Sequence, residues 1–385
     1  MIRRLRHRLT EFRSLTRLLN MPRGERPLVV YSEDSFSWIQ YEALLAETMG
    51  RYGWPVVYIT SDPEDPRLVS HPPQMSVFYL DRMLPGYLPK LDSQILLMTM
   101  PELESLHIKR PRQSRCLYVF HSLNSIHMVY RPRSFDHYDI FFCTGEHHYQ
   151  ELAAHFSRLD REPPELFRVG YPKLDRIYHR HRSYTKKYPD LKTVLVAPSW
   201  GDRNLLEGYG HELTEKLLSA GYRVVVRPHP CFFLPVYPGG RVVVEDLARD
   251  FGGHPRFILE RSIDTEDAFH EADLMLSDWS GAAYEYAFGT ERPVLFFDVP
   301  RKELNPAWKD LGLVPFEDRM RTQAGYLCAL SEITAVGERV DAALRSGGAF
   351  RDRLRTLREQ CVYNFGRSAE VGAEILNGLL RARAS

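Results

Sequence analysis

The pattern that most limits what this chain can fold into is a repeated alternation of short apolar runs with longer amphipathic segments. In the first half, segments with helical periodicity, such as 35–51 and 146–158, separate apolar runs that are bounded by turn residues. Strands separated by helices are typical of a parallel sheet that is covered on both faces. The strands predicted for this first doubly wound domain are 27–31, 55–60, 76–80, 94–99, 116–120 and 139–144.

A second alternation follows a polar stretch at 179–192, HRHRSYTKKYPDLK, which has the composition of an interdomain connection. The strands predicted there are 193–197, 223–227, 256–259, 273–276 and 293–297, and the tail from 321 to 383 is helical in pattern, with a break near Gly347. A chain of 385 residues is too long for one ordinary core. We therefore predict an α/β protein of two doubly wound, Rossmann-like domains that face each other across a cleft, over residues 21–182 and 183–385.

Residues 1–20 form a separate basic segment with helical periodicity. Apolar residues recur on one side of this helix: Ile2, Leu5, Leu9, Phe12, Leu15, Leu18 and Leu19. Arginines occupy the other faces, and Glu11 is the only acidic residue among them; the arginines are Arg3, Arg4, Arg6, Arg8, Arg13 and Arg17. Such a helix suits the surface of an anionic membrane, and we expect residues 2–19 to contact one. A terminal helix docked on its own domain, or a mitochondrial presequence, would show the same pattern.

Composition excludes several classes of protein. A formal net charge of +1 argues against nucleic-acid binding. The five cysteines are scattered without a CxxC pair, so neither a zinc cluster nor a disulfide framework is expected, and a reducing cytoplasm fits best. No run of about 18 apolar residues and no apolar signal segment occurs, so we expect a chain that neither spans a membrane nor is exported.

Function is expected in the loops that follow strands, because open α/β sheets bind ligands beyond the carboxyl ends of their strands. Four of these loops carry polar residues: 120–124 (FHSLN), 197–201 (APSWG), 227–230 (RPHP) and 277–281 (SDWSG).

The loop 277–281 leads from a predicted strand into a predicted helix. Free backbone amides at the start of a helix attract anions. Ser280 adds a hydroxyl donor and Gly281 allows close approach of the backbone, which together suit a diphosphate. Glu285, one helical turn further, is expected to accept the hydroxyls of a nucleotide ribose. An ordinary capped helix would have the same sequence.

Two further loops offer groups for phosphate binding and proton transfer. Prolines hold Arg227 and His229 on a short, stiff loop, where a guanidinium binds phosphate oxygens and an imidazole donates to phosphate or moves a proton. His121 follows a predicted strand of the first domain, from which it could serve as a general base toward the facing loop. Either histidine could instead be a structural residue bonded to backbone.

The order and spacing of these segments resemble the CDP-glycerol glycerophosphotransferase family, the teichoic-acid primases and polymerases. The segments that carry the resemblance are VGYPKLDRIY at 169–178, TVLVAPSWG at 193–201, RPHP at 227–230 and LSDWSGAAYEYAFGTERPVLFFD at 276–298. The resemblance implies a GT-B-like fold and an enzyme that moves a polyol phosphate from a CDP-linked donor to a hydroxyl of a glycan, polyol-phosphate polymer or lipid-linked acceptor, in the synthesis of a cell-surface polymer.

The same resemblance implies roles for individual residues. Arg227, His229, Asp278 and Ser280 would surround the donor diphosphate, with Ser199 nearby, and His121 would be the base that activates the acceptor.

The chain departs from the family pattern at two positions in these loops. The family histidine usually opens a His-Gly-Thr-Pro stretch, whereas His121 is followed by Ser122-Leu123-Asn124, and Gly281 replaces a second serine. The first change affects which acceptor is expected and the assignment of His121 as the catalytic base. The second removes one hydroxyl from the phosphate site and leaves its backbone amides.

The mechanism we expect is an in-line displacement at phosphorus. A hydroxyl deprotonated by His121 attacks the β-phosphorus, and CMP leaves with its charge stabilised by Arg227, His229 and the amides of Ser280 and Gly281. The sequence requires no metal or other cofactor and is compatible with a bound Mg²⁺.

The alternatives to this function are a glycosyltransferase that uses a nucleotide sugar, a nucleotide-sugar epimerase, and a non-catalytic nucleotide-binding scaffold at a membrane. We expect the protein in the cytoplasm, peripherally associated with the inner face of the cell membrane.

Overall fold

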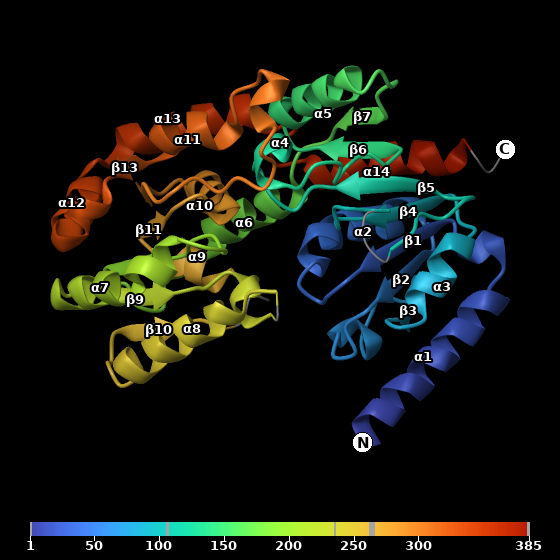
Figure 1. Cartoon of the computed structure of the whole chain (residues 1–385), viewed down its shortest axis with the longest axis horizontal. Coiled ribbons are helices and arrows are strands. Elements are labelled where there is room, and N and C mark those ends of the chain that lie inside the picture. Colours follow the sequence, from blue (N-terminus) through green and yellow to red (C-terminus); the bar gives the residue numbers. More distant parts are fainter. Residues whose placement is uncertain (1, 105–107, 235, 262–265, 383–385) are drawn as a thin grey trace.

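Two parallel sheets with interleaved helices make up the protein (Figure 1). The computed structural model describes residues 2–104, 108–234, 236–261 and 266–382. The first sheet has seven strands in the order β3-β2-β1-β4-β5-β6-β7. Its strands are β1 Leu28–Ser32, β2 Val56–Thr60, β3 Met75–Tyr79, β4 Ile95–Met98, β5 Arg115–Val119, β6 Ile140–Cys143 and β7 Glu165–Arg168.

The second sheet has six strands in the order β10-β9-β8-β11-β12-β13, all of them parallel. Its strands are β8 Thr193–Val196, β9 Arg223–Val226, β10 Phe257–Leu259, β11 Leu274–Ser277, β12 Val294–Phe297 and β13 Tyr326–Cys328. The strand order reverses between β1 and β4 in one sheet and between β8 and β11 in the other. These reversals are the topological switch points at which such sheets bind ligands.

Both faces of each sheet are buried. Along β1, Leu28 and Val30 belong to one apolar cluster and Val29 and Tyr31 to another, on the opposite face. A strand that is buried on both sides reads as a continuous apolar run, which is why the sequence revealed it. The predicted fold class of two doubly wound domains is confirmed.

The edge strands β7 and β13 were not predicted. Both ends of β7 are exposed and only Cys328 of β13 is buried, so neither strand shows a buried apolar run. The expectation that the tail from residue 321 is helical throughout was therefore wrong at β13. Pairing with the neighbouring strands β6 and β12 creates these two strands.

Helices connect the strands and cover the sheets (Figure 1). They are α1 Ile2–Asn20, α2 Trp38–Tyr52, α3 Leu84–Tyr87, α4 Ile126–Val129, α5 Glu146–Arg158, α6 Pro172–Ser183, α7 Leu205–Ser219, α8 Pro238–Phe251, α9 Asp267–Glu271, α10 Gly281–Thr290, α11 Phe316–Ala324, α12 Val336–Arg345, α13 Gly347–Cys361 and α14 Ser368–Arg381. Short 3₁₀ turns also occur, among them η2 Pro66–Leu68 between β2 and β3, and η4 Pro230–Phe233 after β9.

Two helices join the halves of the molecule. Helix α6 contacts α2 on one side and α10 on the other. The C-terminal helix α14 returns to the first sheet and packs on α2, where the Trp54 indole donates a 3.0 Å hydrogen bond to Asn377 Oδ1. The predicted division at residue 182 thus falls inside α6, and the domain boundary stays a prediction.

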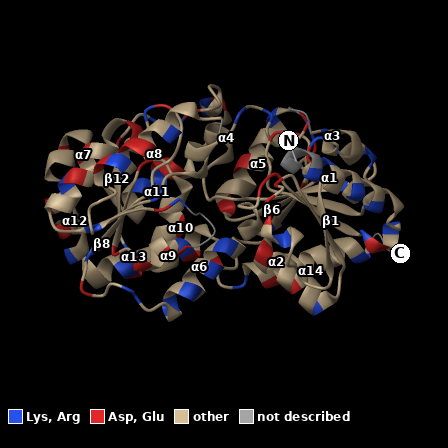
Figure 2. Cartoon of the chain, turned by 90° about the horizontal axis from the view of Figure 1, so that it is seen from below, with Lys and Arg blue, Asp and Glu red and all other residues tan. Residues whose placement is uncertain are grey.

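Helix α1 is docked on the first domain by one side and exposes apolar residues on another. Glu11 accepts hydrogen bonds from the amides of Asp81 (2.8 Å) and Met83 (2.7 Å), while Leu18 is fully buried. By contrast, the exposed fractions of Leu9 and Phe12 are 53% and 58%. Basic residues recur along the helix (Figure 2). The side chains of residues 1–5, which carry part of the predicted pattern, lie outside the described part.

Among the residues that the structure describes, no helix is both long and apolar enough to cross a membrane.

Candidate active site between the two sheets

The predicted strand-to-helix turn is present at the carboxyl end of β11. Ser277 ends the strand, and Ser280 is the N-cap of α10, with its Oγ accepting a 3.3 Å hydrogen bond from the amide of Ala282. The extended backbone of Ser280 (φ −77°, ψ 135°) turns the chain into the helix. The N-terminus of a helix carries a partial positive charge and unpaired amides, so this turn is suited to an anion.

Asp278 joins this turn to the loop that follows β8. Its carboxylate is fully buried and accepts hydrogen bonds from the amides of Ser199 (2.7 Å) and Leu205 (3.1 Å). The Ser277 hydroxyl donates to the carbonyl of Ala197 at 2.8 Å. Asp278 therefore holds the Ser199 loop in place beside the switch point, and the predicted contact of either residue with a diphosphate stays a prediction.

Gly281 lies directly against the loop of the first domain that contains His121. A Cβ on residue 281 would stand 2.7 Å from Asn124 Oδ1 and 3.1 Å from Ser122 Cβ. The Asn124 amide group donates a 3.2 Å hydrogen bond across the domains to the carbonyl of Trp279. The two stretches in which the chain departs from the family pattern are therefore in contact, and the loop after β5 touches the start of α10.

The His121 ring is held by Thr99 and Tyr130 of the first domain. Its Nδ1 lies 3.1 Å from the carbonyl of Thr99 and 3.2 Å from the Thr99 hydroxyl, while its Nε2 lies 3.1 Å from the hydroxyl of Tyr130. A carbonyl only accepts, so this geometry assigns the proton of the neutral ring to Nδ1 and leaves Nε2 as the acceptor. Desolvation, opposed by the Thr99 hydrogen bond, lowers the pKa of His121 to about 4, with a further contribution from the charge of Lys173. The imidazole is thus neutral at pH 7, as a base must be.

A buried carboxylate connects α10 to α6 and to His121. Glu285 accepts a 2.6 Å hydrogen bond from Tyr171 and forms a 2.7 Å ion pair with Lys173. The Tyr171 hydroxyl also lies 2.8 Å from the carbonyl of His121, so it links the two. Both carboxylate oxygens of Glu285 have partners, and its predicted contact with a ribose stays a prediction.

His229 is the N-cap of η4. Its Nδ1 accepts a 3.2 Å hydrogen bond from the amide of Cys231. Desolvation lowers the pKa of His229 well below its usual value, and the positive charges of Lys302 and Lys173 lower it further. The centre of the His229 ring lies 6.0 Å from that of Trp200. That His121 and His229 act in one site stays a prediction.

Lys302 lies in the loop after β12, at the same edge of the second sheet. Its ammonium group stands 4.1 Å from the centre of the Trp200 ring. Desolvation lowers the pKa of Lys302 to about 8, and the negative charge of Asp278 opposes that shift. Lys302 is thus a cation beside His229 that is only partly solvated.

Arg227 is directed to a different set of residues. Its guanidinium forms a 3.1 Å ion pair with Glu260 and lies 5.4 Å from the centre of the Phe269 ring. Residues i and i+2 of a regular strand point to the same side, but Pro228 and Pro230 end the regular strand, so Arg227 and His229 need not share partners. No contact between Arg227 and either His229 or Ser280 is seen among the described residues, and its role at the diphosphate stays a prediction.

The residues that sequence reasoning missed are Lys173, Lys302, Tyr171 and Tyr130. Tyr171 and Lys173 belong to the stretch 169–178 that carried part of the family resemblance, and this was the signal that pointed to them. Lys302 and Tyr130 lie in no such stretch. Among the described residues, no group of three or more His, Cys, Asp or Glu side chains is placed to hold a metal ion.

Comparison with known proteins places this site in context. The model of a family described as CDP-Glycerol:Poly(glycerophosphate) glycerophosphotransferase matches residues 110–354, which include both histidine loops and the start of α10. Among curated proteins, none matches the chain by sequence.

Several solved structures share the fold. The wall teichoic acid polymerase TagF superposes with a TM-score of 0.63 at 13% identity, and the match covers 99% of each chain. A UDP-N-acetylglucosamine 2-epimerase from Listeria monocytogenes has a TM-score of 0.58 at 14% identity, covering 94% of this chain and 97% of that one. Sucrose-phosphate synthase from Thermosynechococcus elongatus has a TM-score of 0.51 at 15% identity, covering 93% and 100%. The GT-B-like arrangement of the two domains is confirmed.

Proposed function

Because the chain belongs to the CDP-glycerol:poly(glycerophosphate) glycerophosphotransferase family, we propose that it transfers glycerol phosphate, or a similar polyol phosphate, from a CDP-linked donor to a hydroxyl of a cell-surface polymer or its precursor. The observation that supports the proposal is the contact of the His121 loop with the start of α10, where Gly281 lies against Ser122 and Asn124. The donor diphosphate would lie at the N-terminus of that helix.

His121 is the base in this proposal. The hydroxyl of Tyr130, 3.1 Å from Nε2, marks the place where an acceptor hydroxyl would stand. The acceptor oxygen attacks the β-phosphorus as its proton passes to Nε2, and the bond between that phosphorus and the bridging oxygen breaks. CMP leaves with the electron pair. An anionic donor would raise the pKa of His121 from its low value and make it a stronger base.

Positive charge for the leaving group would come from Lys302 and Lys173, together with the amides at the start of α10. Both lysines lower the pKa of His229 electrostatically, which supports a place for them near the proposed diphosphate. His229 would donate a proton or hydrogen bond to the same group. We propose that these groups act without a metal, and turnover that persists in EDTA would support this, whereas dependence on added Mg²⁺ would contradict it.

A place at the inner face of the cell membrane is part of the proposal. Leu9, Phe12 and Leu19 are 53%, 58% and 59% exposed along α1, and arginines flank them. An exposed apolar stripe with basic flanks suits an anionic bilayer. Phe12→Glu should reduce pelleting with phosphatidylglycerol vesicles. The control is Val314→Glu, because Val314 is also exposed (62%) but lies outside α1. Equal pelleting of both variants would remove the membrane claim.

The choice of donor separates this proposal from its alternatives. We would incubate the protein with CDP-glycerol, CDP-ribitol, UDP-N-acetylglucosamine and UDP-glucose, and measure thermal shift and nucleotide release. Stabilisation by a CDP-polyol with release of CMP supports phosphotransfer. Release of UDP into a glycosylated acceptor would instead identify a glycosyltransferase, and binding without release would identify a scaffold.

A further inference from the structure

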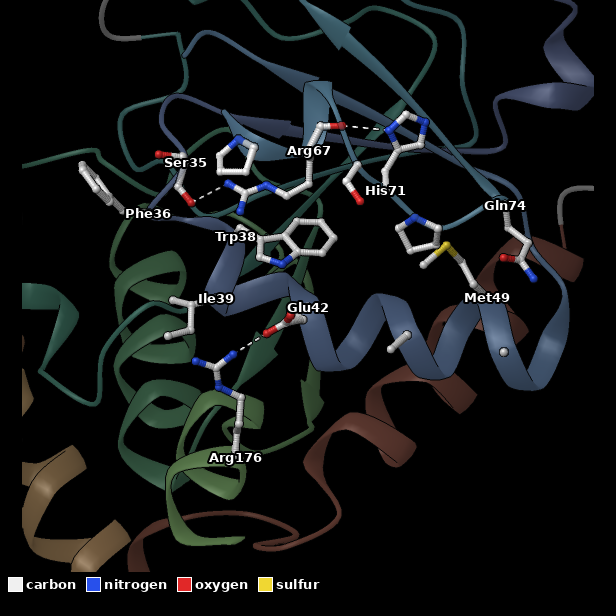
Figure 3. A pocket seen from close by; sticks show the side chains of 15 residues that line it. Ser35, Phe36, Trp38, Ile39, Glu42, Met49, Arg67, His71, Gln74 and Arg176 are labelled. Carbon is white, nitrogen blue, oxygen red and sulfur yellow. Dashed lines mark hydrogen bonds and ion pairs between the residues drawn. The ribbon is translucent and has the colours of Figure 1, made fainter. Parts of the chain in front are cut away.

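The first domain contains a long groove outside the site described above, between α2 and the segment that joins β2 to β3 (Figure 3). Its volume is about 810 Å³, which is within the range of ligand-binding pockets. The lining residues of α2 extend from Trp38 to Gly50, which corresponds to about 18 Å along the helix. The groove is thus long enough for an extended chain.

One end of the groove lies at the carboxyl edge of the first sheet. Ser35 and Phe36 line this end, and they follow β1 at its carboxyl end. Strands β1 and β5 are separated only by β4, so this end and the loop of His121 follow strands that lie about 10 Å apart, at the same edge of the sheet. Asp34, the residue before this end, acts electrostatically on Cys231 in the His229 loop. The end of the groove therefore lies at the same edge of the first sheet as the His121 loop.

The walls of the groove combine flat apolar surface with hydrogen-bonding groups. The Trp38 ring is fixed from two sides, by an edge contact with Tyr58 (5.3 Å between ring centres) and by the guanidinium of Arg67 (5.3 Å). Gln74 and His71 add polar groups along the opposite wall (Figure 3). Rigid aromatic surface beside planar polar side chains suits the apolar faces and hydroxyl rims of sugar rings.

The charges of the groove are paired within the protein. Arg176 forms ion pairs with Glu42 and with Glu266, the latter at 2.8 Å. Arg67 pairs with Asp65 at 2.5 Å and donates to the carbonyl of Ser35 at 2.8 Å. A chain of phosphates would need unpaired positive charge, whereas a carboxylate neutralises each guanidinium here, although the buried Nε atoms of both arginines have no hydrogen-bond partner. The groove is therefore matched to a neutral ligand rather than to a chain of phosphates.

We infer that this groove binds the acceptor, as an extended and uncharged oligosaccharide segment next to the hydroxyl that reacts at His121. The inference rests on the proposed function and narrows it, because it selects a glycan over a polyol-phosphate polymer as the part of the acceptor nearest the reaction.

The test measures binding to the full chain in the absence of donor. Chitotetraose, cellotetraose, maltotetraose and a mannotetraose are titrated, with an oligomer of glycerol phosphate for comparison. Ala46→Tyr fills the groove from the exposed side of α2, and Ser70→Trp fills it from the other wall. The matched control is Ala342→Tyr, on an exposed position of α12 in the other domain.

We expect at least one neutral tetrasaccharide to bind, with at least a tenfold loss of affinity in Ala46→Tyr and Ser70→Trp and no change in Ala342→Tyr. Absence of binding by all four sugars, equal affinity in the filled variants, or binding of the glycerol phosphate oligomer in the groove would overturn the inference. Thermal stabilisation by CDP-glycerol is recorded in parallel. If CDP-glycerol does not stabilise the unmodified protein, the proposed function is refuted, whereas the sugar titrations still decide whether the groove binds a glycan.

Discussion

Gly281 and Asn124 approach each other so closely that a Cβ on residue 281 would stand 2.7 Å from Asn124 Oδ1. Real Cβ atoms do not tolerate such a distance, so one of the two must give way. The contact joins the first turn of α10 to the loop of His121, and Asn124 also bonds to the carbonyl of Trp279. A serine at position 281, as in the family pattern, would meet the side chain of Asn124. The two departures from that pattern are therefore structurally compatible with each other.

Gly281→Ala should lower both thermal stability and turnover, because the added methyl group forces the two loops apart. The penalty should be smaller in an Asn124→Ala background, with a coupling energy of about 0.5 to 3 kcal/mol in a double-mutant cycle. Gly208→Ala is the control, since a Cβ at that helical position meets nothing within 4 Å. Strict additivity of the two substitutions would show that the contact has no energetic role.

The pH dependence of turnover should reveal the unusual state of His121. Only the neutral imidazole accepts a proton, and its pKa in the free enzyme is lowered to about 4. We expect kcat/KM to be level between about pH 6 and 7 and to fall in acid near the lowered pKa, rather than near the ordinary value of about 6.5. Circular dichroism at each pH checks that the fold persists. An acid limb near the ordinary histidine value would contradict this assignment, as would turnover in His121→Gln.

Lys302→Met should weaken the binding of CDP-glycerol by about tenfold, equivalent to about 1.4 kcal/mol, because it removes a cation from the proposed diphosphate site. Affinity for cytidine, which lacks phosphate, should not change. Since the pKa of Lys302 is lowered to about 8, donor binding by the unmodified protein should also weaken as the pH rises through that value.

Lys309→Met is the matched control for this substitution, because Lys309 also lies over a tryptophan, with its ammonium group 5.5 Å from the centre of the Trp308 ring, but on the exposed surface. Equal effects of the two substitutions on CDP-glycerol, or an equal loss of cytidine binding, would exclude a phosphate contact by Lys302.

Glu317 should make stability depend on pH. Its carboxyl group is fully buried at the domain interface, where it accepts hydrogen bonds from the amide of Ser125, and burial raises its pKa to about 8. Because the pKa is raised in the folded protein, protonated Glu317 contributes to the free energy of unfolding. This contribution is complete below the unfolded pKa of about 4.3 and is lost as the pH rises through about 8. Glu317→Gln should remove this decline, which amounts to at most about 1.4 kcal/mol per pH unit.

Denaturant unfolding at pH 5, 6, 7 and 8 measures this effect, with Glu338→Gln, at an exposed position, as the control. Parallel pH profiles for Glu317→Gln and the unmodified protein would show that Glu317 does not titrate in this range.

The sequence was most informative where burial leaves a pattern. Continuous apolar runs such as 28–32 and 194–196 are buried on both faces of a sheet, and their alternation with helices predicted the two doubly wound domains. The edge strand Glu165–Arg168 has no such run, and it forms because β6 offers it a partner. Such a strand depends on tertiary pairing that a single sequence does not display.

For the site, sequence reasoning identified loops better than side-chain directions. The turn at Ser280 and the positions of His121 and His229 follow from strand ends, which meet at one edge of a parallel sheet. The direction of Arg227, toward Glu260, depends on the neighbouring strand, and the position of Lys302 depends on a loop without regular structure. Neither carries a periodic pattern from which it could be predicted.

The identity of the nucleotide that leaves tests the central claim most directly. The protein would be incubated with CDP-glycerol and an acceptor that it glycerophosphorylates, and the nucleotide product would be separated and quantified against the transferred glycerol phosphate. Attack by the acceptor hydroxyl on the β-phosphorus predicts one equivalent of CMP and a new phosphodiester in the ³¹P spectrum, both abolished by His121→Gln. Release of CDP, with the acceptor oxygen bound to carbon and no new phosphodiester, would contradict the account.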